Sequence, residues 1–206
     1  MSVIKKVIFL LVFIPIISIT NSFAEDLKKI GKFKDWEVMI MAETSGKVCF
    51  AQSTPVLQAP KTNKRDARLF ITFRPNEKIS NEISTTAGYE FNKNNSVLAT
   101  SGNNKFKFDI KQQGFAWMTS NKKENIMVKV MKKGSRIMVT GYNEKGSQTI
   151  DHYSLLGFTK AYNTAKKAWF AIIEAAIKAA LIAPSSPIAN VPTGMPFGIC
   201  TIDNRL

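Results

Sequence analysis

Three residue types that can form a hydrolytic triad lie together in the stretch Asp151-His152-Tyr153-Ser154, and His152 is the only histidine of the chain. The surrounding alternation of apolar and polar residues predicts a strand, in which Asp151 and His152 point to opposite faces. The two side chains therefore cannot converge as a triad requires. Ser154 also lacks the G-x-S-x-G turn that exposes a nucleophile. We expect these residues to be structural and the protein not to be an enzyme.

The spacing of the remaining polar residues indicates neither another catalytic site nor a metal site. A zinc site needs about four clustered nitrogen or sulfur ligands, and the chain offers only two cysteines, Cys49 and Cys200, far apart in sequence. The carboxylates Glu82, Glu90 and Asp109 are scattered, and nothing marks two of them as an acid–base pair. We expect no metal and no cofactor.

The two cysteines can form a disulfide in an oxidising compartment, but two residues make no disulfide framework. Cys200 lies in a tail rich in proline and glycine, outside the strand-like part of the chain. We therefore expect Cys49 and Cys200 to be free thiols, with a Cys49–Cys200 bridge as the alternative.

The chain is basic, with 29 Lys and Arg against 15 Asp and Glu and a net charge of +14. Such an excess favours anionic partners. One basic cluster, formed by Lys61, Lys64, Arg65 and Arg68, is predicted in a loop beside Arg74. We expect it to be a solvated face, with a grip on lipid phosphate or acidic glycan as the alternative. No motif for nucleic-acid binding is present, and we expect no nucleic-acid partner.

The amino terminus has the order of parts found in a signal peptide. Lys5-Lys6 precedes an apolar run from Val7 to Ile19, and Ser22-Phe23-Ala24 places small residues at a cleavage site. The run is shorter than the roughly 20 residues that a membrane-spanning helix needs. We expect residues 1–24 to be removed and the mature protein to begin at Glu25, in the periplasm or outside the cell. An uncleaved anchor is the alternative.

Most of the remaining chain shows the two-residue alternation of half-buried strands. The apolar series are Trp36, Val38 and Ile40; Leu69, Ile71 and Phe73; Phe106, Phe108 and Ile110; Phe115 to Met118; and Ile137 with Val139. Gly and Asn in residues 101–104 and 143–146 predict tight turns. The sequence therefore predicts a mainly β fold, an antiparallel β-sandwich with a short helix and a carboxy-terminal helix.

Two segments break the strand pattern. Residues 121–133 have apolar side chains on one helical face, with Asn121 as the predicted N-cap, Glu124 three residues later and Gly134 just beyond the end. The alternative for this segment is a strand. The second helix is predicted from Phe158 to about Ala183, in a stretch free of glycine and proline.

Large aromatic side chains are expected in the core, because sandwich domains bury alternating large residues. They are Trp36, Phe106, Phe108, Trp117 and Phe158. The alternative is that some of them form a platform on which a ligand stacks.

Several short motifs in order resemble the invasion-associated locus B family of Gram-negative bacteria, over about residues 36–168. They are Asp35-Trp36-Glu37-Val38, Val48-Cys49-Phe50, Ser53-Thr54-Pro55, an Arg-Pro strand end at Arg74, Asn81 to Ser84, Gly88-Tyr89-Glu90-Phe91, Ala116-Trp117, Met131 to Gly134, and Asp151 to Ala161. The residues of these motifs that we expect to be structural are Trp36, Cys49, Gly88, Tyr89, Trp117, Gly134, Asp151, Ser154, Leu155, Gly157 and Phe158.

The resemblance implies an exported β-sandwich domain at residues 25–168, tied by the family's name to invasion of host cells, and it brings no catalytic residue or cofactor. Residues 169–206, an apolar helix followed by an irregular tail, depart from the family's pattern. They are either a genuine extension or the product of an altered reading frame. The helix is apolar around Glu174 and Lys178 and can pack on the domain, lie in a membrane interface or meet another chain.

The sequence thus predicts an exported, non-catalytic binding protein of the cell envelope or surface. Its expected partner is a protein, a glycan or a lipid headgroup, with peripheral membrane contact as an alternative. The alternatives are a periplasmic enzyme of unknown chemistry and a structural envelope protein with a membrane-associated carboxy-terminal helix.

The block from Asp151 to Phe158 is predicted to be a corner between the last strand and the last helix. Tyr153 and Leu155 share the face that enters the core, and Asp151 is expected near a turn. Gly157 allows the change of direction, and Phe158 is expected to anchor the helix.

Overall fold

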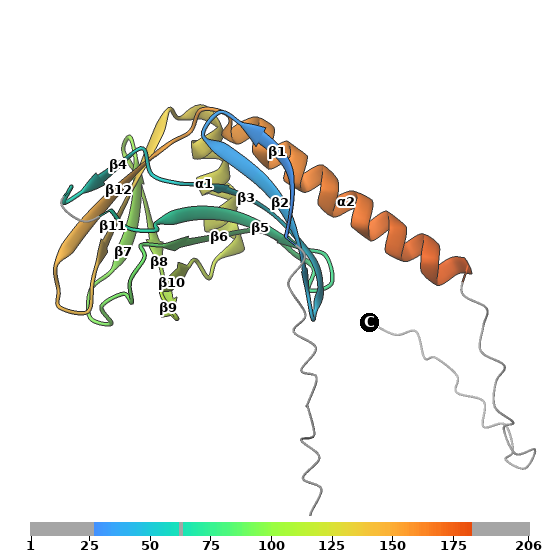
Figure 1. Ribbon diagram of the computed structural model, residues 1–206, viewed down its shortest axis with the longest axis horizontal. Coiled ribbons are helices and arrows are strands. Elements are labelled where there is room, and N and C mark those ends of the chain that lie inside the picture. Colours follow the sequence, from blue (N-terminus) through green and yellow to red (C-terminus); the bar gives the residue numbers. More distant parts are fainter. Residues whose placement is uncertain (1–26, 62–63, 183–206) are drawn as a thin grey trace, which may run out of the picture.

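The computed structural model describes residues 27–61 and 64–182, and its strands form two antiparallel sheets. The seven-stranded sheet consists, in spatial order, of β1 (Lys28–Phe33), β2 (Trp36–Glu43), β3 (Gly46–Ser53), β5 (Arg68–Arg74), β6 (Ile79–Thr86), β10 (Phe115–Trp117) and β9 (Ile110–Gln112). The five-stranded sheet consists of β4 (Leu57–Ala59), β12 (Gln148–Ser154), β11 (Arg136–Tyr142), β7 (Val97–Ser101) and β8 (Asn104–Phe108). The helices are α1 (Asn121–Lys133) and α2 (Phe158–Ile182) (Figure 1). The predicted signal peptide and Cys200 lie outside the described residues.

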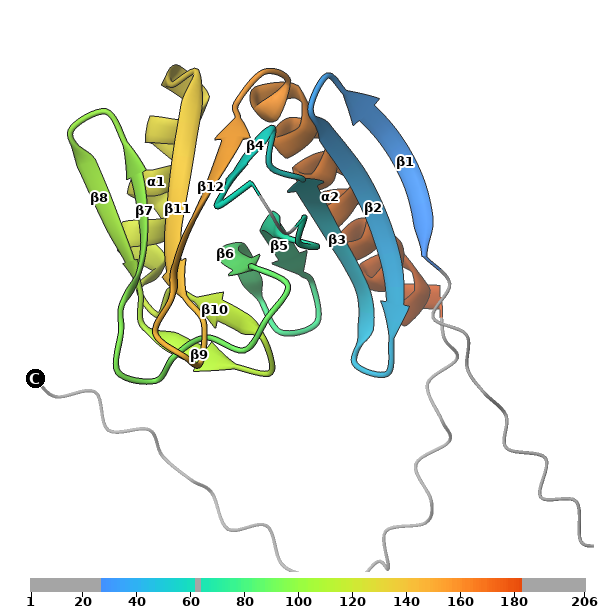
Figure 2. The same ribbon diagram turned by 60° about the vertical axis from the view of Figure 1, so that its left-hand side comes forward.

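One core joins the two sheets and the two helices. Trp36 and Phe73 come from the seven-stranded sheet, Tyr153 from the five-stranded sheet, Met127 from α1 and Phe158 from α2, and each of them is fully buried. Figure 2 shows β7, β8, β11 and β12 on one side of the molecule and β1, β2 and β3 on the other, with α2 behind β2 and β3. The predicted mainly β fold with two helices is confirmed.

The alternation in the sequence placed most strands correctly. Leu69, Ile71 and Phe73 are fully buried on one face of β5, and Phe106 and Phe108 are buried in β8. Ile110 is a correction, because its side chain is 48% exposed. The chain leaves the five-stranded sheet after Phe108, and Ile110 begins β9 at the edge of the other sheet.

The first helix is confirmed, but its ends differ from the prediction. Ser120 is the N-cap, and its hydroxyl accepts a hydrogen bond from the backbone N–H of Lys123 at 3.4 Å. Glu124 turns away from the helix end and accepts a bond of 3.0 Å from the backbone N–H of Ile83. Burial raises the pKa of Glu124, more than the bond from Ile83 lowers it. Gly134 ends the helix in an extended conformation, donating to the carbonyl of Val130.

The corner between β12 and α2 forms as predicted. Tyr153 and Leu155 are buried, and Phe158 packs edge-on against Trp36 with ring centroids 4.9 Å apart. Gly157 has a φ of +89°, and a β-carbon at this position would collide with the backbone carbonyl of Phe33. The corner therefore requires glycine for both its conformation and its contact with the end of β1.

A buried ion pair corrects two further expectations. Asp151 lies within β12 and not at a turn, with 2% of its side chain exposed. The guanidinium of Arg65 donates to both of its carboxylate oxygens, at 2.7 and 3.0 Å, and the amide of Gln58 donates at 3.1 Å. Only 11% of the Arg65 side chain is exposed, so this residue is not part of a solvated face. Strand periodicity puts Asp151 on the inner face with Tyr153, where a carboxylate needs a partner.

The second helix is continuous across residues 168 and 169. Its first half buries Phe158, Ala161, Tyr162 and Ala165, while its last residues are exposed. Neither described helix combines the length and the apolar character required to cross a membrane.

Candidate binding face on the seven-stranded sheet

The seven-stranded sheet has one face in the core and one face, here called the outer face, turned away from α2. The alternation of β5 separates Leu69, Ile71 and Phe73, which are buried, from Phe70 and Thr72, which point to the outer face. The register places Ser84 of β6 opposite Phe70 and Trp117 of β10 opposite Ser84, so Trp117 shares the outer face. In Figure 2 the outer faces of β2 and β3 are turned toward the reader, with α2 behind them.

Four aromatic side chains form a row on the outer face, and we call them the aromatic row. They are Phe50 from β3, Phe70 from β5, and Phe115 and Trp117 from β10. The ring centroids are 6.0 Å apart from Phe50 to Phe70, 6.0 Å from Phe70 to Phe115 and 5.5 Å from Phe115 to Trp117, where the rings are stacked. Each ring is only partly buried. Together with Met41 and Thr72 they line a hollow of about 320 Å³.

Trp117 was expected in the core, and the structure corrects that expectation. The core side of β10 is occupied by Ala116, which is fully buried, so its two aromatic neighbours must point outward. Trp36, Phe106, Phe108 and Phe158 are in the core as expected. The alternative of a stacking platform therefore fits Trp117 together with Phe50, Phe70 and Phe115, which were not among the aromatic residues considered for it.

A charged cluster borders the aromatic row at the end of β5. Arg74 lies 2.7 Å from Glu43, 3.6 Å from Glu82 and 3.9 Å from Glu77, measured between nitrogen and oxygen. Burial alone would lower the pKa of Arg74, but Glu82 and Glu43 outweigh it and raise that pKa. Burial raises the pKa of Glu82 despite the nearby guanidinium. With three carboxylates around one cation, this end of the hollow carries a surplus of negative charge.

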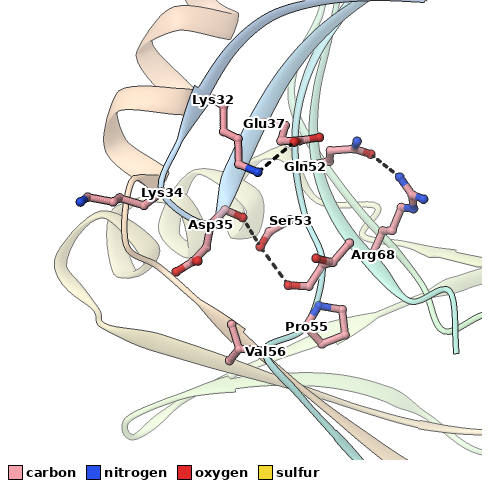
Figure 3. A pocket seen from close by; sticks show the side chains of 10 residues that line it. Lys32, Lys34, Asp35, Glu37, Gln52, Ser53, Pro55, Val56 and Arg68 are labelled. Carbon is pink, nitrogen blue, oxygen red and sulfur yellow. Dashed lines mark hydrogen bonds and ion pairs between the residues drawn. The ribbon is translucent and has the colours of Figure 1, made fainter. Parts of the chain in front are cut away.

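A polar pocket of about 360 Å³ lies at the opposite end of β5, where β1, β2 and β3 meet (Figure 3). Lys32, Lys34 and Arg68 bring three positive charges to its lining, and Asp35 and Glu37 bring two negative ones, so the pocket carries one net positive charge. Glu37 contacts Lys29 at 2.5 Å and Lys32 at 3.6 Å. The hydrogen bond from Lys29 lowers the pKa of Glu37. This pocket has the opposite charge balance from the cluster around Arg74.

Arg68 and Gln52 connect the pocket to the aromatic row. The guanidinium of Arg68 donates to the side-chain oxygen of Gln52 at 3.3 Å, as Figure 3 shows, and to Asp66 at 3.0 Å. Gln52 is in register with Phe70 on the neighbouring strand. From the Arg68 end of β5 to its Arg74 end, the outer face therefore carries a positive pocket, then the aromatic row, then a negative cluster.

The basic cluster expected from the sequence is divided by the structure. Lys61 and Lys64 are exposed, whereas Arg65 is only partly exposed and is paired with the buried Asp151. Arg68 and Arg74 lie at opposite ends of β5, each with its own acidic partner. The five residues do not form one anion-binding surface.

In the structure, Asp151, His152 and Ser154 do not form a catalytic triad. The carboxylate of Asp151 is occupied by Arg65 and Gln58, and the hydroxyl of Ser154 accepts a bond from the backbone N–H of Leu156 at 3.2 Å. In residues 27–61 and 64–182 no three His, Cys, Asp or Glu side chains are grouped to hold a metal ion.

The remaining motif residues lie at separate places. Cys49 is fully buried, and burial raises the pKa of its thiol to about 11. Gly88 lies against the backbone of Asp66, and the hydroxyl of Tyr89 is hydrogen-bonded to Thr149 at 2.5 Å. None of these residues borders the aromatic row.

Comparison with known proteins shows a shared fold. The crystal structure of invasion associated protein B from Bartonella henselae superposes with a TM-score of 0.50. The match covers 68% of this chain and 97% of that chain, at 12% sequence identity. No protein-family model matches the chain, and a search of curated proteins gave no significant match.

Proposed function

We propose that this protein is an exported, non-catalytic binding protein of the cell envelope or surface, and that it binds a partner protein on the outer face of its seven-stranded sheet. The observation that carries the proposal is the aromatic row. Its four adjacent, partly exposed rings form an apolar cluster on a sheet face, and apolar clusters open to solvent mark interaction sites. Aromatic residues are also enriched at the centres of protein interfaces.

The charges on either side of the aromatic row define the partner further. A partner segment with apolar side chains for the row and a basic residue for Glu43, Glu77 and Glu82 would be complementary to this end of the face. Lys32 and Arg68 would attract an acidic residue at the other end. A protein segment supplies all three chemistries together, whereas a lipid headgroup would use only the basic end.

Two observations support export and a role without catalysis. The amino-terminal residues have the order of a signal peptide. The fold is shared with a protein whose name associates it with invasion. We extend to this chain only a binding role at the envelope or surface.

The experiment is a capture from envelope extract with the tagged mature chain, residues 25–206. Three baits are compared: wild type, the double variant Phe70→Ala/Trp117→Ala, and Ile126→Ala. Ile126 is the matched control because it is an exposed apolar residue, 44% accessible, on α1 and away from the outer face. We expect one protein to be captured by wild type and by the control and lost from the double variant.

Other results would contradict the proposal. Equal capture by all three baits would place the contact elsewhere, and binding that is retained by the double variant but competed by an acidic glycan or by phosphate would assign a different ligand. Urea unfolding of each bait verifies that the substitutions leave the fold intact.

A further inference from the structure

The last part of α2 carries an apolar stripe that residues 27–61 and 64–182 leave exposed. Phe170, Ile177 and Leu181 are 47%, 55% and 82% exposed, and Ile173 is partly exposed. Their spacing of three, four and four residues places them on one face of the helix. Figure 1 shows this part of α2 extending beyond the strands of the sheet.

A neighbouring face of the same helix anchors it to the domain. Trp169 and Ile172 pack against the core, and the ring of Trp169 lies 6.0 Å from that of Phe73. Because the anchoring face is fixed, the stripe formed by Phe170, Ile173, Ile177 and Leu181 cannot rotate onto the domain. Among the described residues nothing covers it, and it can contact a partner outside the domain.

The charged residues beside the stripe are complementary to the same residues in a second copy of the chain. Glu174 and Lys178 are one turn apart and lie along the same edge of it. When two copies of α2 cross antiparallel about a two-fold axis near Ala175, Ile173 comes level with the partner's Ile177. Glu174 then lies within about two residues, roughly 3 Å of rise, of the partner's Lys178, and the symmetry makes this contact twice.

Apolar side chains also meet at both ends of this contact. Phe170 comes within one residue, about 1.5 Å of rise, of the partner's Leu181, and both residues lie on the stripe. The two-fold axis makes this apolar contact twice. We propose that the stripe on α2 is a self-association surface that pairs antiparallel with α2 of a second copy of this chain.

A membrane surface fits the same stripe less well. A helix that lies in a membrane interface has a strongly charged face opposite its apolar one. The residues opposite the stripe include Ala171, Ala175 and Ala179, which carry no charge. The acidic Glu174 at the edge of the stripe would also oppose an anionic bilayer, whereas it is paired in the two-fold arrangement.

Sedimentation equilibrium of the mature chain, measured over a series of concentrations, tests the proposal. We expect reversible dimerisation that weakens about tenfold or more in Glu174→Lys and in Lys178→Glu, because each change replaces two attractions with two repulsions. The double variant Glu174→Lys/Lys178→Glu restores both attractions and is expected to dimerise within about twofold of wild type. Ile177→Lys is expected to abolish the dimer, and Lys160→Glu, exposed on the same helix but outside the stripe, is the control with unchanged association.

Circular dichroism verifies that each variant keeps its helix. A wild-type chain that stays monomeric at every concentration would overturn the proposal, as would a double variant that associates no better than the single ones. Flotation of the wild-type chain with vesicles containing anionic lipid, lost in Ile177→Lys while the protein in solution is monomeric, would assign the stripe to a membrane.

Discussion

The indole nitrogen of Trp36 donates a hydrogen bond of 2.9 Å to the carbonyl oxygen of Ser154, across 118 residues of chain. It joins the start of β2 in one sheet to the end of β12 in the other. The backbone N–H of Asp35 donates to the carbonyl of Leu156 at 3.3 Å beside it. The corner before α2 is therefore held to the seven-stranded sheet by main-chain atoms of the block that ends in Phe158, and the side chain of Ser154 is not needed for this link.

This arrangement predicts different costs for two adjacent substitutions. Leu155→Ala removes a buried side chain, 5% exposed, and should lower the free energy of unfolding by about 2–4 kcal/mol. Ser154→Ala removes only a local hydroxyl contact and should cost under about 1 kcal/mol. Urea unfolding of both variants measures the difference. If Ser154→Ala abolished an activity without changing the unfolding midpoint, the block would be a functional site and the non-catalytic proposal would fail.

Gly157 should be far less tolerant of alanine than another glycine with a similar backbone angle. Gly157→Ala adds a β-carbon that collides with the carbonyl of Phe33, and we expect a loss of about 3 kcal/mol or more. Gly146 has a φ of +81° and open space around it, so Gly146→Ala should cost only about 1–2 kcal/mol. Thermal or urea unfolding compares the two, and equal losses would mean that the contact with Phe33 is unimportant.

Two aspartate–arginine pairs, one formed by Arg65 with Asp151 and one by Asp66 with Arg68, should contribute unequally to stability. Asp151→Asn leaves the guanidinium of Arg65 buried without its counter-charge, and we expect a loss of about 3–5 kcal/mol. Asp66→Asn breaks the pair with Arg68, in which the Asp66 side chain is 76% exposed, and should cost under about 1 kcal/mol. Replacing both Arg65 and Asp151 by apolar residues should recover part of the loss. A small effect of Asp151→Asn in urea unfolding would contradict this account of the pair.

Glu124 should give the stability a measurable dependence on pH. Its pKa is raised in the folded state by burial, so between its unfolded and folded pKa values the folded state holds more protons than the unfolded state. The stabilising contribution of Glu124 is therefore present at low pH and is lost as the pH rises through that window.

Glu124→Gln keeps an oxygen for the N–H of Ile83 and removes the titration. The free energy of unfolding of this variant, relative to that of wild type, should increase as the pH is raised from about 4 to about 7, because only wild type loses the contribution of Glu124. Urea unfolding at the two pH values makes the comparison. A difference between variant and wild type that does not change with pH would show that Glu124 titrates normally.

Periodicity in the sequence was enough to predict the β fold, both helices and the corner at Gly157, because each depends on residues close together in the chain. Leu69, Ile71 and Phe73 are buried as their alternation indicates. The same reasoning failed for Trp117, since alternation separates two faces of a strand without showing which face is covered. Ala116 is buried on the other side, a fact that only the packing of the two sheets decides.

Contacts between residues far apart in the sequence explain the other differences between the predicted and the observed structure. Arg65 and Asp151 are 86 residues apart, so nothing local shows that the loop arginine neutralises a carboxylate on β12. Glu124 lies three residues after the predicted N-cap, but in the fold it accepts a hydrogen bond from the N–H of Ile83 on the neighbouring strand β6. The aromatic row was missed because its members come from three strands that are not consecutive in the sequence.

Site-specific photo-cross-linking tests most directly whether the outer face is the binding face. The photoreactive residue p-benzoylphenylalanine is placed at Phe50, at one end of the aromatic row, or at Ile126 on α1, and each mature protein is irradiated in envelope extract. The proposal predicts a discrete cross-linked partner from Phe50 and none from Ile126. A partner cross-linked from Ile126, with none from Phe50, would contradict the assignment of the outer face.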